Sequence, residues 1–391
     1  MARKLSPNEI PKDWKYDLLD NFAFRCSGHT PSQSFPEYWN GGVKWVSLAD
    51  SWRLDNGLIS ETEKEISEEG LKHSSAELHP AGTVLMSRDA GIGKSAIMAV
   101  PMAVSQHFIA WKCDNSEKLY NWFLYNWLQL NKSEFERQAV GSTIKTIGLP
   151  FFKKLKIAVP PIKEQKKIAE ILSTWDKAIE TVEKLVANSQ QQKKALMQQL
   201  LTGQKRLLDD NGVKFGDEWA KGKLSDLANI SKGKALSSKN IKNGNYPVIA
   251  GGKTSPYCHN DFTHENVVTV SASGAYAGYV AYHSSKIWAS DCSVITEKGN
   301  SDINFIFQLL SHLQSTIYSL QSGGAQPHVY PKDLEIIEVR IPSKKEQEKI
   351  AQVLTLADRE IDLYQQQLDK LKLEKKSLMQ QLLTGQKRVK I

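Results

Sequence analysis

The chain contains a long internal repeat, and this repeat constrains the fold more than any other feature. Residues 193–206 read KKALMQQLLTGQKR and residues 375–388 read KKSLMQQLLTGQKR, with a single difference in fourteen positions. The offset of 182 residues continues without a gap back to Pro160 and Pro342. The chain is therefore an internal duplication, and its two halves are expected to share one architecture.

Each copy of the repeat is predicted to be one long helix. Pro160 and Pro342 suit the approach to a helix, and Gly203 and Gly385 suit its C-terminal cap. About 40 residues of helix would span roughly 60 Å. Between these limits apolar residues recur at alternate spacings of three and four, which predicts a coiled coil. Its seam is predicted to contain Ile168, Leu172, Trp175, Ile179, Val182, Ile350, Leu354, Ile361, Tyr364 and Leu368.

Both copies interrupt the seam with a lysine, Lys193 in the first and Lys375 in the second. Polar residues in a coiled-coil seam can fix the register and the orientation of the helices, at some cost in stability. Two helices with one apolar stripe each most simply bury those stripes against one another. The sequence therefore predicts that the two helices pair.

The segments before the helices also correspond, but more faintly. Trp14 aligns with Trp219 and Gly28 with Gly233, at an offset of 205. Residues 82–94 and 266–280 both read as strand, small-residue turn, glycine and strand, and residues 140–160 and 322–342 both end in an alternating strand. We therefore expect two mixed α/β domains of one fold, with diverged side chains, carried by a nearly unchanged helical frame.

This pattern predicts an α+β chain with a pseudo-two-fold internal repeat. Its segments are predicted to be a first domain at 1–160, a helical spacer at 161–206, a second domain at 207–342 and a second helical spacer at 343–391. No apolar run approaches the roughly 20 residues that span a bilayer, and the first residues carry no apolar signal-peptide core. A cytoplasmic protein without a membrane partner is therefore expected.

The positive charge of the chain is concentrated in the helical repeats. Of the net charge of +8, residues 161–206 and 343–391 carry +4 each, while residues 1–160 and 207–342 carry +1 and −1. A basic surface attracts polyanions, nucleic acid first among them. Lysines on long helices can also serve only to keep the helices soluble, so charge alone leaves both interpretations open.

Motifs for chemistry are missing. GIGKS at 91–95 resembles part of a phosphate-binding loop, but Arg88 stands where the first glycine is required, so a turn between two strands is expected. Pro160–Pro161 lacks the flanking residues of an adenine methyltransferase motif. The nine histidines and four cysteines show no ligand spacing. We therefore expect no catalytic residue, no metal and no cofactor in this chain.

The order of domain, helix, domain, helix resembles the specificity subunits of type I restriction–modification systems. The resemblance covers essentially the whole chain. It lies in the junction IAVPPIKEQKKIAEIL (157–172) with its repeat VRIPSKKEQEKIAQVL (339–354), in IPKDW (10–14) with its echo FGDEW (215–219), in the turn SGGAQPHV (322–329), and in the helix ending LMQQLLTGQKR.

The resemblance implies that the domains are target-recognition domains, each reading one half of a gapped, asymmetric site in double-stranded DNA. It implies that the two helices pack antiparallel and set the spacing of the half-sites. Two methyltransferase subunits would dock on this frame, and two restriction subunits can join them. S-adenosylmethionine would belong to the methyltransferase partner, which methylates a flipped-out adenine, and ATP and Mg to the restriction partner.

Candidate DNA contacts are polar, basic or aromatic residues on the expected loops, because bases are read by such side chains and phosphates by lysine and arginine. In the first domain they are Arg25, Thr30, Gln33, Ser87, Arg88 and Lys94. In the second domain they are Lys232, Lys234, Lys253, Thr254, Tyr257, Ser273, Tyr276, Gln326 and His328.

Two other interpretations belong to different classes of protein, and a third is a finer alternative within the same class. A fused enzyme that also methylates would need more length and the motifs that are missing here. A coiled-coil scaffold for proteins alone would explain the helices but not two diverged domains of one fold. A subunit of a methylation-only system, without a restriction partner, fits this sequence equally well.

Overall fold

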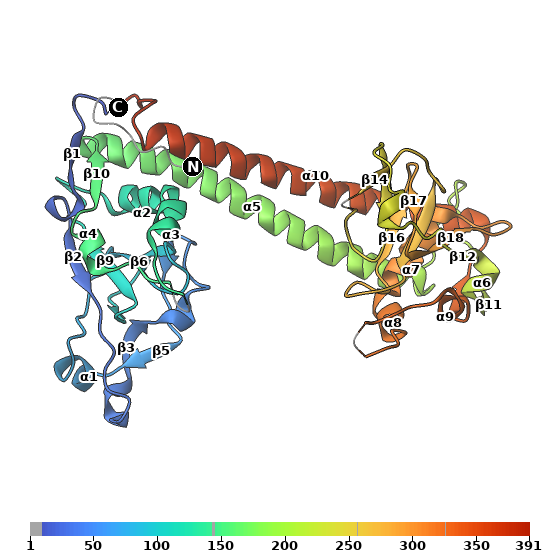
Figure 1. Cartoon of the computed structure of the whole chain (residues 1–391), viewed down its shortest axis with the longest axis horizontal. Coiled ribbons are helices and arrows are strands. Elements are labelled where there is room, and N and C mark those ends of the chain that lie inside the picture. Colours follow the sequence, from blue (N-terminus) through green and yellow to red (C-terminus); the bar gives the residue numbers. More distant parts are fainter. Residues whose placement is uncertain (1–9, 143–144, 256, 325) are drawn as a thin grey trace. The chain divides into compact units, whose positions relative to one another are not determined.

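The computed structural model describes residues 10–142, 145–255, 257–324 and 326–391. The expected lack of a signal peptide concerns residues outside these ranges. The chain forms two compact units, unit 1 (Met1–Thr181 with Gln367–Ile391) and unit 2 (Val182–Gln366). Each unit thus contains one domain and a part of both long helices, α5 (Ile162–Leu201) and α10 (Lys344–Leu382) (Figure 1). The segment boundaries inferred from the sequence separate domains from helices, whereas the two units divide each long helix between them. Those boundaries therefore stay a prediction.

Unit 1 is built on two small sheets and a strand pair. The larger sheet has the order β2 (Phe24–Ser27), β9 (Phe108–Lys112), β6 (Val84–Ser87), β7 (Ser95–Met98) and β4 (Leu58–Ile59). The smaller sheet has the order β5 (Lys64–Ile66), β3 (Trp39–Val46) and β8 (Ala103–Val104), and β1 (Lys15–Leu18) pairs with β10 (Lys156–Val159). The helices are α1 (Glu68–Lys72), α2 (Asn121–Leu130), α3 (Lys132–Gln138) and α4 (Leu149–Phe152).

Unit 2 has matching sheets. Its larger sheet has the order β12 (Ala228–Lys232), β18 (Cys292–Glu297), β15 (Val267–Ser271) and β16 (Val280–His283). Its smaller sheet has the order β14 (Cys258–His259), β13 (Tyr246–Ile249) and β17 (Trp288–Ala289), and β11 (Ala220–Lys223) pairs with β19 (Glu338–Ile341). The helices are α6 (Leu224–Leu227), α7 (Ile303–His312), α8 (Gln314–Ser319) and α9 (Pro331–Glu335).

The correspondences expected from the sequence are confirmed strand by strand. β1 and β11 are related by the offset of 205 and pair with β10 and β19, which are related by the offset of 182. The offset of 182 also relates the starts of α2 and α7, of α3 and α8, and of α4 and α9. The first four residues of GIGKS lie in the turn between β6 and β7, as predicted, and Ser95 begins β7.

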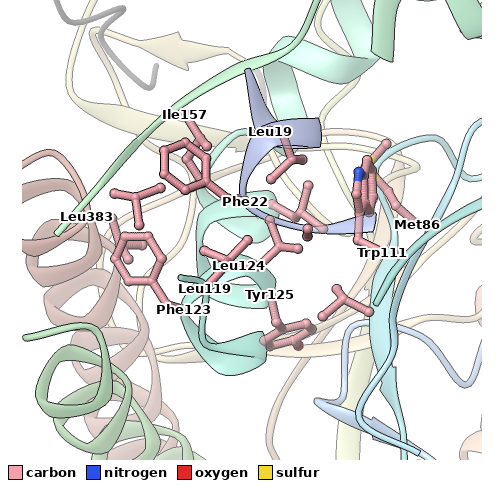
Figure 2. Packing of buried hydrophobic residues seen from close by; sticks show 14 of the residues in the cluster. Leu19, Phe22, Met86, Trp111, Leu119, Phe123, Leu124, Tyr125, Ile157 and Leu383 are labelled. Carbon is pink, nitrogen blue, oxygen red and sulfur yellow. The ribbon is translucent and has the colours of Figure 1, made fainter. Parts of the chain in front are cut away.

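The helix ends are part of the domain cores. In unit 1, Ile168 and Leu172 of α5, and Leu382 and Leu383 at the end of α10, belong to the same buried cluster as Phe123 of α2. Figure 2 shows Leu383 and Phe123 within this cluster. The matching cluster of unit 2 contains Leu200, Leu201, Ile350 and Leu354, together with Val268 and Val270 of β15. Burying a leucine or isoleucine side chain stabilises a fold by about 1.5–3 kcal/mol. The helices are therefore fixed to the domains by apolar packing.

The seam residues fall into three groups. The outer ones, Ile168, Leu172, Ile350 and Leu354, are buried in the domain cores. Val182 and Leu368 are buried as well, although they belong to neither of these two clusters. The half-buried seam residues are Trp175, Ile179, Ile361 and Tyr364.

The two seam lysines form ion pairs with the partner helix. In unit 1, Lys375 of α10 pairs with Asp176 of α5, and in unit 2, Lys193 of α5 pairs with Asp358 of α10. The four residues are two copies of one pair, since each lysine and each aspartate is related to its counterpart by 182 positions. A charged pair at a fixed place in an apolar seam disfavours any shifted register, because a shift would leave the charges half-buried and unpaired.

A second duplicated contact lies where each helix meets a domain. Glu164 is fully buried and accepts hydrogen bonds from Arg388 at 2.6 and 2.7 Å. Its copy, Glu346, accepts two from Arg206 at 2.6 and 2.7 Å. In unit 1, the Asp176–Lys375 pair is followed by the Glu164–Arg388 pair, so the residue number falls on the α5 side while it rises on the α10 side. The Lys193–Asp358 and Arg206–Glu346 pairs show the same opposite order in unit 2. The helix segments within each unit therefore run antiparallel.

The IPKDW and FGDEW motifs have their structural role at this contact. The indole of Trp14 donates to Glu164 at 3.3 Å and the indole of Trp219 donates to Glu346 at 2.9 Å. Asp13 adds a salt bridge to Arg388, whose hydrogen bond lowers the pKa of that aspartate. These motif residues are thus engaged in holding the frame together.

Candidate nucleic-acid interface

In unit 1, four loops meet at the end of the larger sheet where β2 and β6 finish and β9 begins. The backbone nitrogen of His29 donates to Val104 O at 3.1 Å, which joins the loop after β2 to the segment before β9. Arg88 N donates to His107 O at 3.0 Å, and Ile147 N donates to Arg88 O at 2.9 Å. The turn after β6 is therefore held between the other loops, and we call this meeting point loop surface 1.

The side chains of loop surface 1 form a polar network. The guanidinium of Arg88 donates to Ile147 O at 3.1 Å and to Gln106 O at 3.4 Å. The carboxylate of Asp89 contacts Thr146 Oγ1 on one side and His107 Nδ1 on the other. These bonds orient the side chains before any ligand binds, which reduces the entropy lost on binding.

Unit 2 repeats this arrangement with the same backbone hydrogen bonds. Lys234 N donates to Ala289 O at 2.8 Å, Ala272 N to Asp291 O at 3.1 Å, and Val329 N to Ala272 O at 3.0 Å. Arg88 therefore corresponds to Ala272, and the residues that follow them, Asp89 and Ser273, correspond as well. We call the meeting point of these loops loop surface 2.

The two loop surfaces differ in chemistry at matching positions. Where unit 1 has Asp89, His107 and Thr146, unit 2 has Ser273, Asp291 and His328. The hydroxyl of Ser273 donates to the carboxylate of Asp291, and Ser273 forms a β-bridge with His328. One backbone frame thus presents two different patterns of hydrogen-bond donors and acceptors.

A glycine at the start of each loop surface is required by close packing. A Cβ on Gly28 would lie 1.9 Å from Val104 O, and a Cβ on Gly233 would lie 2.4 Å from Ser290 O. No side chain fits there, because real Cβ atoms do not approach backbone oxygen so closely. The alignment of Gly28 with Gly233 in the sequence therefore reflects one shared close approach in the two units.

Loop surface 2 is rich in lysine and aromatic side chains. Lys253 Nζ lies 5.3 Å from the ring centres of both Tyr276 and Tyr279, and Lys234 Nζ lies 5.2 Å from that of Trp288. The side chain of Tyr276 remains 44% exposed. A basic group beside an exposed ring, as at Lys253 and Tyr276, is a combination suited to contact phosphates and bases.

Most of the residues selected from the sequence lie on these two surfaces or beside them. Thr30 contacts Gln106, Gln33 is exposed on the loop after β2, and Lys94 follows the turn after β6 and donates to Ser51 O at 2.9 Å. In unit 2 the set on the loops, or at the strand ends beside them, comprises Lys232, Lys234, Lys253, Thr254, Tyr257, Ser273, Tyr276, Gln326 and His328.

Two selected residues are placed otherwise. Ser87 is fully buried, because it is the last residue of the central strand β6, and its hydroxyl donates to Ala90 O at 3.2 Å; the expectation that it is exposed is wrong. Arg25 lies within β2 and pairs with Asp20 at 3.0 Å, which leaves it less available than a loop residue.

Several residues of the loop surfaces were not selected from the sequence, among them Gln106, His107 and Asp291. They lie just before β9 and β18, in short connections whose lengths differ between the units. The sequence offers one signal for these residues: each is polar and lies just before a buried strand.

Within the described ranges, no helix is long and apolar enough to cross a membrane. Among the described residues, one group of histidine, cysteine and carboxylate side chains lies close enough together to hold a metal ion: Cys26, Glu77 and His79 in unit 1.

Comparison with known proteins identifies the family. The model of the type I restriction modification DNA specificity domain matches twice, at residues 11–188 and 216–373. The two matches correspond to the two copies of the repeat, and together they cover most of the chain. The chain belongs to the family of type I restriction–modification DNA specificity proteins.

Individual relatives agree with this assignment. The chain is 33% identical to the type I restriction enzyme MjaIX specificity subunit of Methanocaldococcus jannaschii over 180 residues, which are 45% of this chain and 41% of that subunit. It is 24% identical to the MjaVIII specificity subunit of the same organism over 97% of this chain and 94% of the relative.

Solved structures show the same fold. The crystal structure of the type I S subunit from M. genitalium matches with a TM-score of 0.64 at 18% identity, over 98% of this chain and 99% of that one. A chain from a structural study of type I complex assembly and conformational transition matches with a TM-score of 0.60 at 16% identity, over 96% and 99%. The fold predicted from the sequence, two similar mixed α/β domains with two long helices, is confirmed.

Proposed function

We propose that this chain is the sequence-reading subunit of a type I methyltransferase complex, and that each unit reads one half of a gapped DNA site through its loop surface. The observation that carries the proposal is the contrast between frame and surface. The ion pairs and buried glutamates of the frame are duplicated residue for residue, whereas the loop surfaces differ at matching positions.

The asymmetry of the proposed site follows from those differences. Asp89 can only accept hydrogen bonds when ionised, whereas Ser273 at the matching position both donates and accepts. Arg88 can donate two hydrogen bonds to a guanine edge, whereas Ala272 at the matching position can contact only a methyl group. The two half-sites are therefore expected to differ in sequence.

The proposal places all chemistry in partner subunits. Two methyltransferase subunits would dock on the helical frame and bind S-adenosylmethionine, and restriction subunits, where the system has them, would bind ATP and Mg. The duplicated frame supports a pair of identical partners, because each unit presents its own copy of the same helix segments. Access to DNA places the complex in the cytoplasm.

The experiment that tests the proposal maps methylated adenines by long-read sequencing. Host cells carry the methyltransferase partner with or without the gene for this chain. We expect a bipartite motif with an unspecified gap that is methylated only when the gene is present. Absence of any gene-dependent motif would favour a scaffold that binds proteins alone. A motif that is methylated but never cleaved would indicate a methylation-only system.

Replacing Lys253 by alanine is expected to weaken DNA binding for all sequences alike. A lysine that meets a phosphate contributes affinity but no sequence preference, and its loss should lower the slope of log affinity against log salt by about one. Binding of the assembled methyltransferase to a site duplex is measured across a salt series. The matched control is Lys286→Ala, a lysine two residues before β17 whose ammonium lies 4.4 Å from the ring centre of Phe262. Equal losses for both variants would contradict the assignment.

A further inference from the structure

The group Cys26, Glu77 and His79 in unit 1 has a feature that packing does not explain. His79 is fully buried, and neither of its ring nitrogens has a hydrogen-bond partner in the described part of the protein. A buried polar group without a partner costs about 1–3 kcal/mol, and an imidazole has two such atoms. Burial of the His79 ring is therefore unfavourable unless a ligand binds to it.

We propose that Cys26, Glu77 and His79 form a binding site for a divalent ion of the zinc class. One nitrogen of His79, the thiol sulfur of Cys26 and a carboxylate oxygen of Glu77 all lie within 4.8 Å of one another. Sulfur, imidazole nitrogen and carboxylate oxygen are together the donor set of zinc, whereas calcium and magnesium prefer oxygen alone. With three protein ligands, the fourth position would hold a water molecule.

The backbone around the site is already fixed. His79 exchanges two backbone hydrogen bonds with Met102, at 2.8 and 3.0 Å, and Cys26 lies in β2 opposite Ala110 of β9. Glu77 is the exposed member, since its side chain is 60% exposed. An exposed carboxylate can adjust its position to close the site without disturbing the buried members.

The protonation states favour binding on one side and oppose it on the other. Burial lowers the pKa of His79 to about 4, so its ring is neutral at pH 7 and able to act as a ligand. Burial also raises the pKa of Cys26, so the thiol must release its proton to solvent when the ion binds.

Lys112 is the charged neighbour that has to be accommodated. Its ammonium lies 3.6 Å from the Glu77 carboxylate and 5.7 Å from the ring centre of Phe24. A carboxylate has two oxygens, so Lys112 can keep one while the ion takes the other. Ligating carboxylates are generally hydrogen-bonded by an outer partner, and the Lys112 ammonium would take that role here.

Zinc content and cobalt spectroscopy of the full chain test the site. The protein is purified without chelator and its metals are measured by mass spectrometry. We expect about one zinc per chain, and a thiolate-to-cobalt charge-transfer band when the zinc is removed and Co²⁺ added. Both signals should be lost in Cys26→Ser and in His79→Ala, and retained in Cys113→Ser and Cys258→Ser, whose thiols lie outside the group.

Glu77→Gln keeps the test decisive if the buried variants do not fold. This exposed position tolerates substitution, and the variant should bind Co²⁺ more weakly than the parent protein at every pH. Absence of zinc together with absence of a cobalt band in the parent protein would overturn the site. A band that persists in Cys26→Ser, or Co²⁺ binding unchanged in Glu77→Gln, would overturn it as well. None of these readouts depends on DNA recognition.

Discussion

Replacing residues 1–160 with the matching segment of a relative that reads a different half-site is expected to change one half of the methylated motif and to leave the other half intact. The reason is that the two loop surfaces belong to separate cores. Loop surface 1 rests on the cluster around Trp111 and Phe123, and loop surface 2 on the cluster around Val268 and Phe305. The measurement is the methylated motif in host cells that carry the chimera with its methyltransferase partner.

The sharpest form of this experiment uses the chain itself as the donor. Residues 207–342 in place of 1–160 would put two copies of loop surface 2 on the same frame. The junctions are compatible, because Glu164 and Glu346 make the same contacts with an arginine and a tryptophan. We expect a motif in which the second half-site occurs twice as an inverted repeat. If a single-domain exchange alters both half-sites, recognition is not divided between the units as we propose.

The frame of this protein could be predicted from its sequence because the frame is encoded locally. A heptad pattern with prolines before it and a glycine after it specifies a helix within one stretch of chain. Gly203 and Gly385 both adopt a φ of +73°, as a C-terminal cap requires. Lys193 and Lys375 are recognisable in the sequence because they interrupt the apolar heptad pattern. Their partners, Asp358 and Asp176, could not be identified, because a pairing between helices depends on their register.

The loop surfaces could be predicted only in part. Turn residues are visible in the sequence, and so Arg88 and Ser273 were selected at matching turns. The residues before β9 and β18 that contact these turns were not selected, because strand pairing brings them to the turns from distant positions in the sequence. Ser87 was wrongly expected on the surface, since a strand end and the following turn look alike in sequence. Cys26 and His79 meet only because β2 and the segment that pairs with Met102 fold together, so no ligand spacing could indicate them.

Deleting one heptad from each long helix is expected to abolish methylation of the parent motif. The deletion removes residues 181–187 and 363–369, which lie between the ion-paired residues Asp176 and Lys193 on α5 and between Asp358 and Lys375 on α10. Seven residues shorten a helix by about 10 Å. This length is close to three base pairs of DNA. The two loop surfaces can then no longer contact both half-sites at once when these are separated by the gap of the parent motif.

Loss of one half-site reduces binding towards the non-specific level, so affinity for the parent duplex should fall by about a thousandfold or more. A whole heptad keeps the seam and both ion pairs in register, so the variant is expected to fold, which circular dichroism checks. The control variant retains the length and changes only the exposed residues Leu185 and Asn188 to alanine. Binding of the shortened variant is then measured on a library of duplexes whose half-sites are separated by gaps of different length. Recovery at a different gap means that the helices set the spacing, whereas full affinity at the parent gap would show that they do not.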